Sequence, residues 1–165
     1  MKQIESRDCT KCQEAESPNW GLEGEKGLTI VAVLESSDHR ANRTNYQNEL
    51  FLSRSGRAVA EVLGENLEKT VITNAAKCLF QRGFKKPGNQ VYKNCAENVR
   101  RQIEEIQPEI IICFGEKAAE AVTGQKFSEV VGKIIGNIII VHHPRVMTIN
   151  EKTMIKQLLS LAVEP

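Results

Sequence analysis

The sequence predicts an α/β protein, a three-layer α/β/α sandwich around a four-stranded parallel sheet. Short runs of branched apolar residues, typical of buried strands, alternate along the chain with longer segments in which apolar residues recur at helical spacing. Strands that alternate with helices form parallel sheets whose two faces are both covered. The runs predicted as strands are residues 28–34, 70–73, 109–114 and 137–141.

Length and composition fit one globular domain spanning residues 1–165. Hydrophobic residues make up 41% of the chain and charged residues 26%, ordinary values for a soluble protein. No apolar run approaches the ~20 residues that a membrane helix needs. The first residues, Met1–Glu5, lack the apolar stretch of a signal peptide. We therefore expect a cytoplasmic protein with no membrane partner, and a monomer.

The first strand, residues 28–34, is followed by a segment with almost no apolar residues up to Leu50. A loop of this length in a compact domain is usually functional or mobile. The segment Phe51–Gly56 leads into the first helix, in which Ala58, Val59, Val62 and Leu63 form an apolar stripe. Further helices are predicted at about 91–106, at 117–122 and at about 150–162, and a short hairpin arm at 133–136.

Polar side chains follow the predicted strands where each strand ends. In a parallel sheet the carboxyl ends lie on one edge, and ligands of open α/β sheets bind just outside that edge. Asn74 follows the second strand and His143 the fourth, so these two residues are expected to face one cleft. Glu35 and Asp38 follow the first strand. The alternative interpretation is a turn asparagine and a surface histidine without a function.

Four of the five cysteines have spacing typical of a metal site: Cys9, Cys12, Cys78 and Cys95. Cysteines of a cytoplasmic protein favour metal binding or catalysis over disulfides. Four thiolates suit an iron–sulfur cluster or zinc equally well. Cys113 lies inside an apolar run and is predicted to be a buried core thiol.

The net charge of +1 identifies no partner, but residues 69–101 carry eight basic side chains and one acidic one, Glu97. Such a segment fits contacts with phosphates, and equally a solvated helix face with a charged loop. The basic residues are Lys69, Lys77, Arg82, Lys85, Lys86, Lys93, Arg100 and Arg101.

These features together resemble the uracil-DNA glycosylases of the iron–sulfur type, family 4. The segment Thr73–Cys78 resembles the family's Thr-Asn-x-x-Lys-Cys motif, and His143–Pro144 resembles its His-Pro motif. The resemblance covers about residues 9–148 and includes, in order, a Cys-x-x-Cys, Phe51–Gly56, Thr73–Cys78, Cys95, Ile112–Gly115 and His143–Pro144.

The resemblance implies a DNA repair enzyme, an N-glycosyl hydrolase that flips a damaged base out of DNA and leaves an abasic site. It also implies a structural [4Fe–4S] cluster, with zinc as the alternative metal, held by Cys9, Cys12, Cys78 and Cys95. Asn74 would read the edge of uracil, Phe51 would stack on the base, and His143 would donate to uracil O2. Glu35 or Asp38 would place the attacking water. The residues expected to contact DNA are Lys77, Arg82, Lys85, Lys86 and Arg145, with Met147 as a wedge in the base stack.

The first motif departs from the family. The family has Gly-Glu-Ala-Pro-Gly where this chain has Leu34–Asp38, and the loop that follows is about three residues longer. Arg145 stands where a small residue is usual. Three alternatives therefore stay open: a glycosylase for another damaged base, a catalytically impaired iron–sulfur DNA-binding homologue, and a zinc-stapled α/β domain acting on a small nucleotide.

Overall fold

The computed structural model describes residues 2–3, 9, 15–18, 21–24, 26–27, 29–36, 50–51, 53–80 and 87–162. Its strands are β1 (Lys2–Gln3), β2 (Ala15–Pro18), β3 (Leu22–Glu23), β4 (Ile30–Ser36), β5 (Thr70–Ala76), β6 (Cys78–Phe80), β7 (Ile110–Phe114), β8 (Ile134–Ile135) and β9 (Ile138–Val141). Its helices are α2 (Arg54–Leu63), the 3₁₀ helix η1 (Gly64–Lys69), α3 (Asn89–Ile106), α4 (Glu116–Thr123), α5 (Phe127–Val130) and α6 (Ile149–Ala162).

The main sheet has seven described strands in the order β1-β3-β5-β4-β7-β9-β8. Its four central strands, β5, β4, β7 and β9, are parallel, and they are the four strands that the sequence predicted. The register places Leu34 beside Asn74 and Phe114 beside Val141, so the carboxyl ends of neighbouring strands lie at one edge. The α/β class and the parallel core are therefore confirmed.

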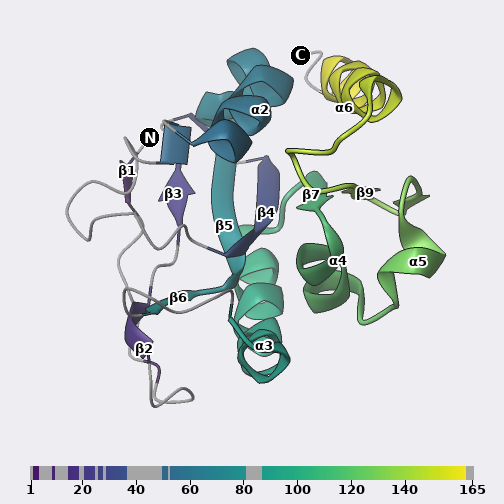
Figure 1. Ribbon diagram of the computed structural model, residues 1–165. Coiled ribbons are helices and arrows are strands. Elements are labelled where there is room, and N and C mark those ends of the chain that lie inside the picture. Colours follow the sequence, from purple (N-terminus) through teal and green to yellow (C-terminus); the bar gives the residue numbers. More distant parts are fainter. Residues whose placement is uncertain are drawn as a thin grey trace.

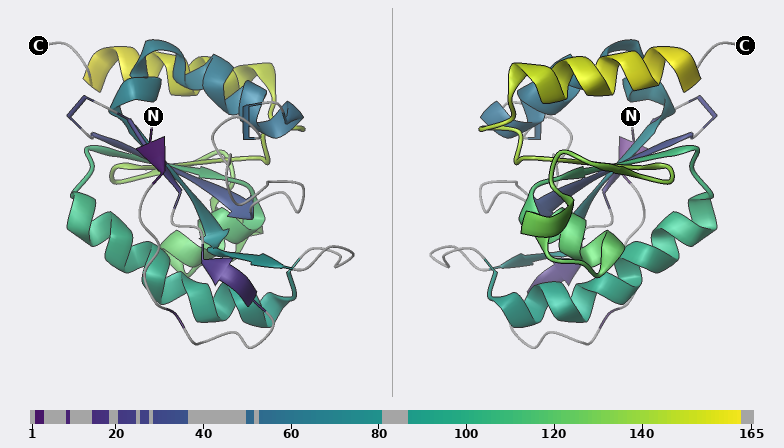
Figure 2. Two further views of the ribbon diagram at one scale, coloured as in Figure 1. Left: turned by 90° about the vertical axis from the view of Figure 1, so that its left-hand side faces the viewer. Right: turned by 90° about the vertical axis from the view of Figure 1, so that its right-hand side faces the viewer.

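The sheet lies between two layers of helices (Figures 1 and 2). Helices α2 and α6 cover one face, and α3, α4 and α5 cover the other. Side chains of a strand point alternately to the two faces. Ile30, Ala32 and Leu34 of β4 accordingly belong to the core under α2 and α6, whereas Val31 and Val33 belong to the core against α3 and α4. We call the face of the sheet covered by α2 and α6 the α2 face, and the face covered by α3, α4 and α5 the α3 face.

Several short elements lie outside the predicted pattern. Strands β1 and β3 extend the sheet antiparallel beyond β5, and β8 closes its other edge against β9 as the predicted hairpin arm. Strands β2 and β6 form a separate two-stranded sheet in which Pro18 pairs with Cys78. The second predicted strand also continues past Thr73 to Ala76, which places Asn74 inside β5 and not at its tip.

The long helices agree with the sequence pattern to within a few residues. Helix α3 ends where Gln107 adopts a left-handed backbone conformation (φ 51°) before Pro108, as the proline predicted. The short helices η1 and α5 were not predicted. None of the described helices is both long and apolar enough to cross a lipid bilayer.

Candidate active site

Asn74 is a buried amide on the α2 face of β5. Its side chain is inaccessible to solvent, and it lies two positions after Ile72, a member of the core on that face. Residues two apart in a strand share a face. The side-chain oxygen Oδ1 is buried and receives no hydrogen bond within the described part of the chain, while other interactions hold the residue. The backbone of β5 therefore fixes one amide near the carboxyl edge of the sheet.

Phe51 packs on the same face, and a tight turn holds it there. The Ser53 hydroxyl donates to the carbonyl oxygen of Leu50 at 2.7 Å and accepts from the backbone N–H of Gly56 at 2.9 Å, which caps α2. A Cβ on Gly56 would lie 1.9 Å from the Leu50 carbonyl oxygen, so only glycine fits this approach. Leu50 and Phe51 contact the core that contains Ile72.

His143 follows the end of β9 and lies against Gly115 at the end of β7. A Cβ on Gly115 would lie 3.3 Å from Cβ of His143, and Gly115 has a positive φ of 96° that favours glycine. The ring atom Nδ1 of His143 accepts from the backbone N–H of Arg145 at 3.3 Å. A neutral imidazole that accepts at Nδ1 carries its proton on Nε2, so His143 has a donor at its outer nitrogen.

The preceding residue, His142, makes an edge-to-face contact with Phe127 of α5 on the α3 face, with ring centroids 5.7 Å apart. Its Nδ1 also lies 2.9 Å from Oε1 of Glu151 on α6, so the His142 ring contacts helices of both layers. Asn74 and Phe51 thus belong to one face of the sheet, and His143 lies beside Gly115 just beyond the carboxyl end of β9.

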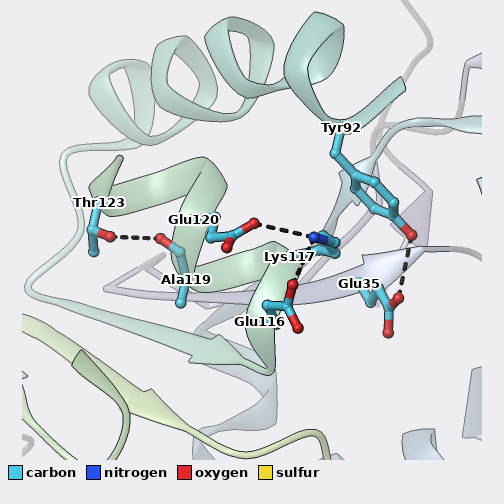
Figure 3. A network of polar contacts seen from close by, with 7 residues as sticks. All are labelled: Glu35, Tyr92, Glu116, Lys117, Ala119, Glu120 and Thr123. Carbon is cyan, nitrogen blue, oxygen red and sulfur yellow. Dashed lines mark hydrogen bonds and ion pairs between the residues drawn. The ribbon is translucent and has the colours of Figure 1, made fainter. Parts of the chain in front are cut away.

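Glu35 lies on the α3 face and is held in a polar network there (Figure 3). The hydroxyl of the buried Tyr92 donates to Glu35 Oε1 at 3.4 Å. The ammonium of Lys117 lies 5.9 Å from the centre of the Tyr92 ring and pairs with Glu116 at 2.7 Å and Glu120 at 3.2 Å. Burial, and secondarily the charge of Glu35, raise the pKa of Tyr92 above its ordinary value, so the phenol stays a donor.

One of the two residues predicted to place the attacking water, Glu35, belongs to this network. The structure does not bring Glu35 to the face of Asn74, because Glu35 is directed to α3. The other predicted residue, Asp38, lies outside the described residues. Tyr92 was not predicted; as a buried aromatic in a helical stripe, it is indistinguishable in the sequence from an ordinary core residue.

Lys77 is buried, so the prediction that it holds a DNA phosphate is wrong. Its exposed fraction is 1%, and its ammonium donates to Thr73 Oγ1 and Gln102 Oε1. Burial lowers the pKa of Lys77 to about 7, against a smaller opposite effect of Cys95. Through these two hydrogen bonds Lys77 links β5 to α3. The predicted contacts Arg82, Lys85 and Lys86 lie outside the described residues.

Three of the four predicted metal ligands are described, and Cys12 is not. Cys78 and Cys95 are buried, with exposed fractions of 3% and 2%. Cys9 is half-buried, and its sulfur accepts from Nδ2 of Asn98 at 3.7 Å, one helical turn after Cys95 on α3. Among the described residues no group of three or more histidine, cysteine or acidic side chains is arranged to hold a metal ion.

Cys113, which the sequence assigned to the core, is inaccessible to solvent. Burial raises the pKa of its thiol to about 12. This cysteine is therefore a protonated core residue, distinct in environment from the cysteines near α3.

In the segment after His143, the apolar residue exposed to solvent is not the one that the sequence predicted. Met147 packs into the core of the α2 face with 9% of its surface exposed, so the prediction that it wedges into the base stack is wrong. Val146 is 66% exposed and its N–H donates to the His143 carbonyl oxygen at 2.9 Å, closing a turn. Arg145 is exposed beside it. The apolar side chain that this turn presents to solvent is Val146.

Glu151 is a further polar residue that the sequence analysis missed. Its carboxylate contacts both His142 and Thr148, at the two ends of the segment that carries His143. The pattern Thr148-x-x-Glu151 is a capping box, which was visible in the sequence before the last helix.

The fold is that of an α/β protein with Asn74 and His143 near the carboxyl edge of a parallel sheet, a position that binds ligands. A family model of the uracil DNA glycosylase superfamily matches residues 30–163. The chain belongs to this superfamily. It is also 31% identical over 77 residues to the type-4 uracil-DNA glycosylase of Archaeoglobus fulgidus. That match covers 45% of this chain and spans 38% of the length of the curated relative.

Proposed function

We propose that this chain is a DNA glycosylase of base excision repair that flips uracil out of DNA and hydrolyses its N-glycosidic bond, leaving an abasic site. The observation that carries the proposal is the buried amide of Asn74 on the face to which Phe51 belongs, near the edge of the sheet at which His143 lies beside Gly115. The superfamily match and the name of the Archaeoglobus relative support the class of reaction.

In this proposal the extruded base lies between Phe51 and Asn74. The amide donates to O4 of uracil and accepts from N3–H, a pattern that cytosine reverses, so the wrong base loses about 1–3 kcal/mol. Stacking on the Phe51 ring contributes about 1–3 kcal/mol for any base. Asn74 thus selects uracil over cytosine, whereas Phe51 contributes binding energy for any base.

His143 acts on the departing base. Negative charge develops on uracil O2 as the glycosidic bond breaks, and the Nε2–H of His143 donates to it. A donor aimed at developing charge supplies about 3–4 kcal/mol of transition-state stabilisation. The backbone N–H of Arg145 donates to Nδ1 of His143, which favours the tautomer with the proton on Nε2. Water then attacks the oxocarbenium-like sugar, and we assign its placement to Asp38 in preference to Glu35, because Glu35 is bound to Tyr92.

We propose further that Cys9, Cys12, Cys78 and Cys95 hold a structural [4Fe–4S] cluster. The burial of Cys78 and Cys95 and the contact of Cys9 with the helix of Cys95 support this ligand set, and thiolates suit the cluster. Bound there, it would staple the N-terminal segment to β6 and α3. Zinc is the alternative metal, and a colourless protein with stoichiometric zinc would favour it over a brown one absorbing near ~400 nm.

The proposed DNA surface comprises Arg145 and Val146 together with Arg82, Lys85 and Lys86. Arg145 and Val146 are exposed on the turn after His143. Arginine and lysine neutralise phosphates, and an apolar side chain fills the gap that an extruded base leaves in the stack.

The test is incubation of the freshly purified protein with single- and double-stranded uracil-containing oligonucleotides, followed by alkaline cleavage of abasic sites. Strand scission should depend on both Asn74 and His143, and fall sharply in N74A and H143A. Ser128→Ala, an exposed change on α5, serves as the matched control. Absence of scission by wild type in large excess, with its metal retained, would reject the proposal.

A second candidate function is DNA binding without catalysis. The specific observation in its favour is that Glu35, the simplest counterpart of the glutamate in the family's first motif, is bound to Tyr92 on the α3 face. A non-catalytic homologue would bind uracil-containing DNA with salt-dependent affinity and release no base.

A further inference from the structure

One carboxylate joins the two ends of the segment that carries His143. Oε1 of Glu151 accepts from the backbone N–H of His142 at 2.9 Å and lies 2.9 Å from Nδ1 of the same residue. Because a carboxylate only accepts, the His142 ring donates from Nδ1. Oε2 accepts from the backbone N–H of Thr148 at 2.8 Å and from its hydroxyl at 3.0 Å.

The helical side of this arrangement is rigid. The hydroxyl of Thr148 accepts from the N–H of Glu151 at 3.2 Å, which completes a reciprocal capping box at the start of α6. Ile155 and Leu159 anchor α6 in the core of the α2 face, with exposed fractions of 0% and 2%. The position of the carboxylate is therefore set by a packed helix.

The contacts of the segment between the two ends include one turn, from the Val146 N–H to the His143 carbonyl, and the contact of the Arg145 N–H with the His143 ring. Met147 packs into the core, whereas Arg145 and Val146 are exposed. A shift at either end would move the imidazole of His143.

A helix cap alone does not require all of these contacts. The capping box uses Thr148 and one oxygen of Glu151, whereas the other oxygen is committed to His142, beyond the end of β9. The glutamate is only 8% exposed, and burial of a carboxylate is costly without several donors. The second oxygen thus serves the segment and not the helix.

We propose that Glu151 is a positioning residue: its carboxylate clamps His142 to Thr148 and thereby presets His143 and the exposed turn for DNA. This inference rests on the proposed function for the role of His143, while the clamp itself is a property of the fold. The two are tested by separate measurements.

The clamp is tested by native-state trypsin digestion, following cleavage of the Arg145–Val146 bond by mass spectrometry. In Glu151→Gln one acceptor oxygen is replaced by an amide group, which cannot accept, so cleavage should accelerate about tenfold. Glu104→Gln, the same change at an exposed position of α3, should cleave at the wild-type rate. Equal rates in Glu151→Gln and wild type would overturn the clamp.

The role of His143 is tested by single-turnover excision of uracil. We expect Glu151→Gln to reduce the rate about 10–100-fold, since misplacement of about 1 Å can cost 100-fold. In a His143→Ala background the same change should reduce the remaining rate less than twofold, because residues that act through one another are not additive. Equal fold losses in both backgrounds would show a general structural effect and overturn the inference.

One further variant and one further measurement keep the test decisive. If melting curves show that Glu151→Gln does not fold, Glu151→Asp retains both oxygens on a shorter side chain and should give an intermediate increase in cleavage. If wild type excises nothing, the proposed function fails, and the inference is then judged by trypsin cleavage and by affinity for single-stranded DNA. An unchanged affinity and cleavage rate in Glu151→Gln would overturn it.

Discussion

Gly115 and His143 close the junction between β7 and β9: a Cβ on Gly115 would lie 3.3 Å from Cβ of His143 and 3.4 Å from its Cα. The backbone N–H of Gly115 also donates to the carbonyl oxygen of Val141 at 2.9 Å, which draws the two strand ends together. The absence of a side chain at Gly115 thus allows His143 to approach this closely.

Gly115→Ala should destabilise the protein and displace His143. The backbone at Gly115 (φ 96°, ψ 178°) is nearly restricted to glycine, so an alanine there costs about 1–3 kcal/mol. Urea unfolding measures this loss, and excision of uracil should fall further than the loss of folded protein explains. Gly136→Ala is the control, because Gly136 has a positive φ of 60° with open space around it. Equal excision by the two variants at equal folded fraction would contradict the role assigned to the junction.

Gly56→Ala should displace Phe51. The added methyl group would overlap the Leu50 carbonyl oxygen at 1.9 Å, so the turn before α2 must open. We expect weaker binding of single-stranded DNA, because stacking on Phe51 contributes about 1–3 kcal/mol. Fluorescence anisotropy measures the affinity. Gly88→Ala, at a glycine with nothing near its missing Cβ, should bind as wild type does.

The clamp at Glu151 should fail in acid. Burial opposes ionisation of this carboxyl, but hydrogen bonds from Thr148 and His142 outweigh it and hold the pKa below its ordinary value. A carboxyl with a depressed pKa stabilises the folded state above the pKa of the unfolded chain, about 4.3, and loses this contribution as pH falls through the folded pKa. His142, the titratable group that faces it, remains a donor when protonated.

The measurement is the melting temperature of wild type and Glu151→Gln as a function of pH. The difference should be full at pH ~7 and shrink below pH ~4. For Glu104→Gln the difference from wild type should stay small throughout. A gap between wild type and Glu151→Gln that persists unchanged into strong acid would contradict the assignment.

The cysteines should separate into two classes on substitution. Cys95→Ala should lose bound metal and melt at a lower temperature, because a structural metal contributes directly to folding. Cys113→Ala should retain metal, because Cys113 is a protonated thiol packed among apolar core side chains and is not one of the proposed ligands. Metal analysis and absorbance near ~400 nm distinguish the outcomes. Loss of metal in both variants would point to general unfolding and not to ligation.

The cations Arg145 and Lys77 should behave oppositely in DNA binding. Removing the exposed Arg145 should reduce the slope of log affinity against log salt by about one. Lys77→Met should leave that slope unchanged and lower stability, since its ammonium donates to Thr73 and Gln102 inside the protein. A reduced slope for Lys77→Met would restore the phosphate contact that the structure contradicts.

The parallel core was predictable because runs such as Ile110–Phe114 are branched and apolar over their whole length, as strands covered on both faces must be. The edge strands β1 and β3 were not, because two residues such as Leu22–Glu23 carry no periodicity. Their pairing follows from the position of β5, which is a tertiary property.

The residue types of the site were predictable, but the side to which each side chain points was not. Glu35 and Asn74 both follow apolar runs, yet the alternation of each strand directs Glu35 to α3 and Asn74 to the other face. Lys77 and Met147 both lie where the chain leaves a strand or enters a helix, and no pattern shows whether such a residue turns inward. A shift of one residue along a strand would point the same side chain to the opposite face of the sheet.

Strands β1 and β8, at the two margins of the main sheet, each have two residues, Lys2–Gln3 and Ile134–Ile135. Long bare margins are templates for strand addition and aggregation. Within the described residues, a neighbouring molecule would find only this short stretch of backbone on either side, too little for a lasting cross-chain ladder. Short margins of this kind disfavour the addition of a strand from another molecule to the main sheet.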